Sequence, residues 1–97
     1  MRLLRLKKAD DGVHKFVAVL EDGSDIHNIA FGAKGYSDFS KHKDETRKSS
    51  YIARHKVRED WTKDGVLTSG FWSRWILWNK PTLEDSVKYT VKKFHLI

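Results

Sequence analysis

The chain has 97 residues, the size of one domain, so we expect a single domain over residues 1–97. It has no cysteine, which excludes disulfides, zinc–thiolate sites and a cysteine nucleophile, and no apolar run of about 20 residues, which excludes a membrane span. Nineteen Lys and Arg against 13 Asp and Glu give a net charge of +6, which favours acidic partners such as nucleic acid or an acidic protein surface.

Residues 1–33 predict a small antiparallel β-meander. Three segments rich in β-branched and aromatic residues, at 3–9, 14–20 and 25–33, are separated by turns that contain Asp and Gly. A strand, a turn with Asp-Gly and a second strand are typical of a β-hairpin. Ile26 and Ile29 break the alternation of the third segment, so we expect a β-bulge or a shift of register there. The N-terminal residues carry only isolated apolar side chains between charges, so we expect no signal peptide.

Residues 34–97 predict a glycine-aromatic loop and then three helices. A basic helix capped by Ser40 or Asp44 runs to about Glu59, and a Trp-rich helix follows over residues 71–78. The last helix begins after the N-cap Thr82, and one stripe of it carries Leu83, Val87, Val91 and Phe94. The expected fold class is therefore α+β, with a small N-terminal meander of about three strands packed against about three C-terminal helices.

The strongest charge feature is the segment 41–58. Its seven cations against two acids, Asp44 and Glu45, give +5, and the cations are Lys41, Lys43, Arg47, Lys48, Arg54, Lys56 and Arg58. On one helix, Arg47, Arg54 and Arg58 would form a ladder able to neutralise successive phosphates. The same charges also suit a solvated helix face with pairs such as Asp44–Arg47. The segment is therefore predicted to bind phosphates or an acidic partner surface, and the solvated alternative stays open.

Aromatic residues form the second group of candidate contacts. Four Trp in 97 residues is a high number, and large aromatic side chains supply both cores and interface anchors. We expect two or three of the Trp in the core and one at a contact surface. The candidate apolar contacts are Tyr36, Phe39, Trp72, Trp75 and Trp78. Tyr36 and Phe39 either fasten the loop to the core or stack on a ligand.

No group of residues suggests catalysis. The adjacent His42, Lys43 and Asp44 point in different directions at the start of a helix, so they do not converge on one phosphate. His14 and His27 have no carboxylate beside them on the same face, so they make no convincing metal site. The glycines near Tyr36 do not have the spacing of a phosphate-binding loop. We therefore expect no enzyme, no catalytic residue, no metal, no cofactor and no small-molecule substrate.

Several segments taken together resemble a known family. They are Phe31–Ser40, His42–Asp44, Arg47–Lys48, Tyr51–His55, Trp61–Gly65, Gly70–Trp75 and Leu77–Leu83. This block is similar to a small uncharacterised protein family of nucleocytoplasmic large DNA viruses, including algal and other giant viruses. The resemblance covers residues 31–83 and leaves the first 30 residues without a match beyond a β-hairpin.

The resemblance implies a viral protein that is made in the host cytoplasm and resides in the virion. Its implied function is a non-enzymatic structural one, such as a minor capsid protein that contacts viral capsid proteins. The alternative is a basic nucleic-acid-binding protein that acts in genome packaging or condensation. In that case the segment 41–58 would contact phosphates, and Tyr36 or Phe39 would stack on bases.

Overall fold

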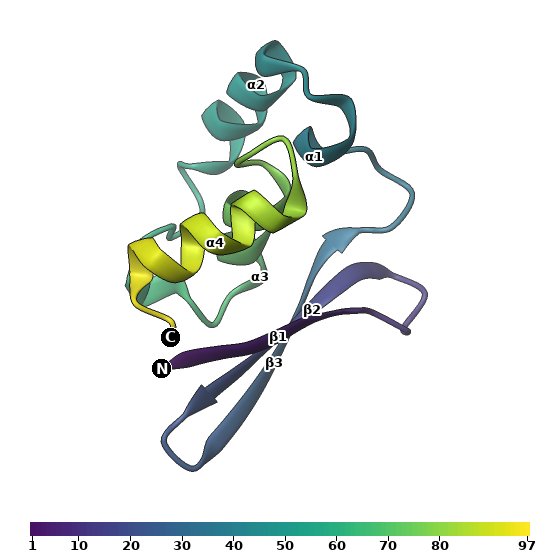
Figure 1. The fold of residues 1–97 in the computed structure, drawn as a ribbon. Helices are drawn as coiled ribbons and strands as arrows, with labels where there is room; N and C mark the ends of the chain where they lie inside the picture. Colours follow the sequence, from purple (N-terminus) through teal and green to yellow (C-terminus); the bar gives the residue numbers. More distant parts are fainter.

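The computed structural model describes residues 1–97 as a three-stranded antiparallel sheet with helices packed on one of its faces (Figure 1). The strands are β1 (Arg2–Lys8), β2 (His14–Asp22) and β3 (Asp25–Ala33), and β2 lies between the other two. The predicted α+β class and the N-terminal meander are thus confirmed. The two termini lie side by side, because the backbone N–H of Leu3 donates to the Leu96 carbonyl at 2.8 Å.

The sheet presents an apolar inner face to the helices. Phe16 pairs with Phe31 across β2 and β3, Ala18 pairs with Ile29, and Leu20 pairs with Leu3 of β1. The β2–β3 register runs without a break, so the bulge expected at Ile26 and Ile29 is absent. The one irregularity of the sheet lies in β1, between Leu3 and Arg5.

The helical half contains more elements than the predicted three. They are α1 (Phe39–His42), α2 (Glu45–His55), the 3₁₀ turn η1 (Lys63–Gly65), α3 (Ser69–Trp72), the π-helical turn η2 (Ser73–Leu77) and α4 (Leu83–Phe94). None of these helices is long and apolar enough to cross a bilayer.

The basic helix predicted to begin after Ser40 or Asp44 begins after Asp44, but its predicted end near Glu59 is wrong. Lys43 adopts a left-handed conformation with φ 55° after α1, and the Asp44 carboxylate then caps α2 by accepting from the backbone N–H of Thr46 and Arg47. At the other end α2 stops at His55. Lys41 therefore belongs to α1, and Arg58 lies beyond α2.

The end of α2 is fixed by a carboxylate that folds back on it. Glu59 Oε2 lies 2.9 Å from Nδ1 of His55, and its Oε1 accepts a hydrogen bond of 2.9 Å from the indole N–H of Trp61. The backbone N–H of Arg58 closes a turn onto the His55 carbonyl at 3.0 Å. The ladder of three arginines on one helix flank is therefore absent, and only Arg47 and Arg54 share α2.

Most of the Trp-rich segment lies in the core. Trp72 is fully buried and Trp75 is 9 % exposed, and the indole N–H of each donates to a backbone carbonyl, that of Val66 and that of Trp61 respectively. Phe39 is buried as well, at 2 % exposure. The prediction that Phe39, Trp72 and Trp75 contact a partner is therefore wrong for the folded chain, because the core already covers these side chains.

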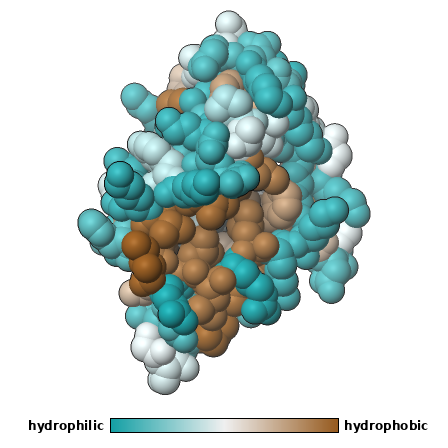
Figure 2. Space-filling model, viewed as in Figure 1, coloured by the Kyte–Doolittle hydropathy of each residue, from teal (hydrophilic) through white to brown (hydrophobic).

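The C-terminal helix packs its predicted stripe against the core, and two further buried residues lie beside that stripe. Its buried residues are Ser86, Thr90 and Phe94, and the Thr90 hydroxyl bonds to the carbonyls of Trp75 and Ser86. Val87 and Val91 are only partly covered. Figure 2 shows apolar side chains gathered on this face of the molecule, where α4 meets the sheet.

The end of β3 approaches the core at a glycine, which gives a test of the packing. Gly32 has a φ of +79°, and a Cβ there would lie 2.6 Å from a side-chain carbon of the buried Leu77. Gly23 has a similar φ of +63° but nothing within 4 Å. Gly32→Ala is expected to lower the free energy of unfolding by about 2–4 kcal/mol, from strain plus overpacking. Gly23→Ala should cost about 1–2 kcal/mol from strain alone.

Chemical denaturation of the two variants measures the difference. Equal losses of stability would contradict the close approach of Gly32 to Leu77.

Candidate functional site

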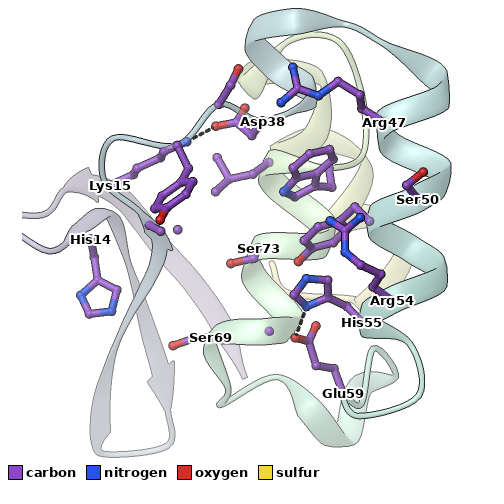
Figure 3. Close-up of a pocket in the computed structure, with 18 of the residues that line it drawn as sticks. His14, Lys15, Asp38, Arg47, Ser50, Arg54, His55, Glu59, Ser69 and Ser73 are labelled. Atoms are coloured by element: carbon purple, nitrogen blue, oxygen red, sulfur yellow. Dashed lines mark hydrogen bonds and ion pairs between the residues drawn. The ribbon is translucent and has the colours of Figure 1, made fainter.

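A cleft of about 830 Å³ lies between α2 and the sheet. Residues of β2, the end of β3 and the loop that follows it form one wall, α2 forms the opposite wall, and α3 and η2 close the floor (Figure 3). This volume falls in the range of ligand-binding sites in proteins. The cleft is therefore the candidate functional site of the protein.

The wall from α2 brings a set of polar side chains to one helix face. Arg47, Ser50, Tyr51 and Arg54 are spaced by three or four residues, so they lie on adjacent turns of the same side of the helix. Figure 3 shows the side chains of Arg47 and Arg54 extending from α2 towards the space in front of the strands. The cap at Asp44 fixes the start of this helix and thereby the position of Arg47.

The acidic residues of the cleft already have side-chain partners. Asp38 lies 2.5 Å from the ammonium group of Lys15, and both side chains are almost fully buried. Glu59 is paired with His55 at 2.9 Å. Neither Arg47 nor Arg54 forms an ion pair. Two guanidinium charges of the cleft thus have no compensating carboxylate, and the charge that would complement them is negative.

Stacked rings line the helix side of the cleft. Tyr51 lies between Trp78, at 4.3 Å and nearly parallel, and His55, at 4.2 Å. Burial, together with the nearby Glu59 carboxylate, raises the pKa of the Tyr51 hydroxyl well above its usual value. The phenol therefore stays neutral, and Tyr51 serves as a rigid support for the arginines on either side of it in α2.

The opposite wall and the floor supply an exposed ring and hydroxyl groups. Tyr36, on the loop after β3, lines the cleft and is 73 % exposed. Ser69 and Ser73 come from the floor, and the hydroxyl of Ser69 donates to the Ala30 carbonyl of β3 at 2.6 Å. The cleft therefore combines two free cations, one accessible aromatic ring and neutral hydrogen-bonding groups.

The structure divides the seven predicted cations into three groups. Arg47 and Arg54 line the cleft. Lys48 has a structural role, because its ammonium group donates to the Asn79 carbonyl at 2.7 Å and lies over the Phe39 ring, and its partial burial lowers its pKa. The other four are exposed outside the cleft, namely Lys41, Lys43, Lys56 and Arg58.

The predicted apolar contacts divide in a similar way. Tyr36 and Trp78 line the cleft, Trp78 with only part of its side chain exposed.

Sequence reasoning missed Lys15, Asp38, His55 and Glu59 as parts of the site. Lys15 and Asp38 are 23 residues apart, and the contact between His55 and Glu59 depends on where α2 ends. No local sequence pattern predicts either pair. No three His, Asp or Glu side chains come together in a geometry that would hold a metal ion.

The structural role of Lys48 can be separated from ligand binding by mutation. Lys48→Ala removes the hydrogen bond to Asn79 and the contact with Phe39, so we expect the free energy of unfolding to fall by about 1 kcal/mol. Lys56→Ala, an exposed lysine at the end of the same helix, should leave stability unchanged within about 0.5 kcal/mol. Thermal unfolding compares the two, and equal stability of both variants would show that the Lys48 contacts contribute nothing.

Comparison with known proteins gives one match, to a family model over residues 4–55. No curated protein and no solved structure matches the chain. The matched residues extend from β1 to the end of α2, so they include the sheet, which the resemblance inferred from the sequence left out, and both cleft arginines. The family's description names no activity and no virus. With more than half of its residues matched, the chain belongs to the family of unknown function DUF5754.

Proposed function

We propose that this protein binds nucleic acid through the cleft, with Arg47 and Arg54 contacting backbone phosphates. The observation that carries the proposal is the pair of guanidinium groups without a carboxylate partner in a cleft whose own acids are paired. Arginine forms bidentate hydrogen bonds with phosphate oxygens, and such charge-assisted bonds are among the strongest in proteins. The net charge of +6 attracts a polyanion to the molecule in addition.

The distribution of aromatic side chains favours this proposal over a protein partner held by the tryptophans. Trp72 and Trp75 are committed to the core, while Tyr36 is open to solvent beside the cationic cleft. In a virus, such a protein would serve genome packaging or condensation.

A structural role in a virion, through contacts with capsid proteins, stays a prediction from the viral resemblance. It requires a contact surface other than Phe39, Trp72 and Trp75. Apolar side chains that the fold leaves partly uncovered include Val87 and Val91 of α4 and Leu6 of β1.

Substitution of single arginines tests the proposed function. Arg47→Ala and Arg54→Ala are each expected to weaken binding of a labelled oligonucleotide by about five- to tenfold at low salt, because each removes a phosphate contact. Each should also reduce the slope of log K against log salt by about 0.7–0.9. Fluorescence anisotropy titrations at several salt concentrations measure both quantities.

Arg58→Ala is the matched control. It removes the same charge from an exposed position outside the cleft, so both the affinity and the salt slope should change much less. Equal effects of all three substitutions would indicate diffuse attraction by net charge and would contradict binding in the cleft. Absence of binding at about 50 mM salt, where phosphate contacts are strong, would refute the proposed function.

A further inference from the structure

We infer that the cleft takes a single-stranded segment of nucleic acid and that one of its bases stacks on the ring of Tyr36. This inference rests on the proposed function and specifies its ligand. It follows from three features of the cleft: the free ring of Tyr36, the concave position of the two arginines, and the spacing between them.

The Tyr36 ring is available for stacking. It is 73 % exposed, pairs with no other aromatic ring, and its hydroxyl forms no hydrogen bond within the protein. Phe39, the first residue of α1 after this loop, is buried and holds the end of the loop to the core. An exposed tyrosine alone has no functional meaning. Here it stands at the edge of a cleft with two unpaired cations, the combination of stacking ring and positive groove that single-strand-binding proteins use.

The arginines line a concave space, whose shape favours a flexible strand over a duplex. Arg47 and Arg54 extend into a space bounded by α2, the sheet and the floor from α3 and η2 (Figure 3). Proteins read duplex DNA by inserting a protruding helix or strand into a groove about 12 Å wide. A concave cleft of about 830 Å³ has the opposite shape and admits a few nucleotides of a flexible strand. The bases of a duplex are stacked on each other and are not free to reach Tyr36.

The spacing of the arginines along the helix corresponds to phosphates that are a few nucleotides apart on one strand. Positions 47 and 54 are seven residues apart, which corresponds to about 10 Å along a helix axis. Phosphates of one stacked strand are about 3.4 Å apart along the axis, so this separation spans about three nucleotides. Hydroxyl groups of Ser50 and Ser73 lie in the same cleft and can bond to sugar or phosphate oxygens between the two cations.

A comparison of single-stranded and duplex oligonucleotides tests the inference. Labelled dT and rU oligomers of about ten nucleotides are titrated beside a DNA duplex of the same length. The wild-type chain should bind a single strand at least tenfold more tightly than the duplex at the same salt concentration. Comparison of the dT and rU oligomers reports whether DNA or RNA is preferred, and preference for either one agrees with the inference.

Substitutions of Tyr36 test the stacking contact. Tyr36→Ala should weaken single-strand binding by about five- to a hundredfold, the loss expected for one stacked base, and leave duplex binding nearly unchanged. Tyr36→Phe keeps the ring and should bind as the wild type does. Val57→Ala, which removes an exposed apolar side chain outside the cleft, is the matched control and should also bind normally. Photocrosslinking to an oligomer that carries 5-iodouracil should label the tryptic peptide Gly35–Lys41.

The outcomes separate the inference from the function on which it rests. Binding that needs Arg47 and Arg54 but is as tight for the duplex, or is unaffected by Tyr36→Ala, would overturn the inference and leave the proposed function intact. If the protein binds no oligonucleotide, both the inference and the proposed function are refuted. Loss of binding in Tyr36→Ala with retention in Tyr36→Phe, together with a crosslink to the loop, would establish single-strand recognition.

Discussion

The stacking of Tyr51 on Trp78 is the contact on which the arrangement of the helical half depends. The two rings lie 4.3 Å apart and within 4° of parallel, and His55 covers the other face of Tyr51. This contact holds α2 against the end of the π-helical turn η2 at a fixed distance from the sheet. The cleft is the space that remains between α2 and β2, so its width is set by a buried aromatic contact and not by the loops at its edge.

Two cations stabilise the contact between α2 and the end of η2 from the side away from the cleft. The guanidinium of Arg74 donates to the Trp78 carbonyl at 2.7 Å and lies over the Trp75 ring, while Lys48 donates to the next carbonyl, that of Asn79. Carbonyls at the end of a helical turn have no partner within the turn, so cations stabilise them. Burial lowers the pKa of Arg74, and the aromatic rings compensate part of that desolvation. These cations are parts of the scaffold.

The different positions and roles of Arg47, Arg54 and Lys48 follow from helix geometry. Residues three, four or seven apart share a face, which places Arg47 and Arg54 together in the cleft and turns the adjacent Lys48 towards the Asn79 carbonyl. The acids within the cleft have local partners, since Asp38 pairs with Lys15 and Glu59 is hydrogen-bonded to His55 and Trp61. Two arginines without a carboxylate partner remain beside the exposed Tyr36, which is the basis of the proposed binding to a single strand.

Local chemistry in the sequence determined the meander, the caps at Asp44 and Thr82 and the positive charge of segment 41–58, because turns, caps and net charge depend on neighbouring residues. Only the tertiary structure decided which cations are free and which aromatic rings are covered. The split between α1 and α2 depends on the left-handed Lys43, and the burial of Trp72 depends on contacts with β3 and α4. Burial and ion pairing depend on residues distant along the chain, and no local pattern reports them.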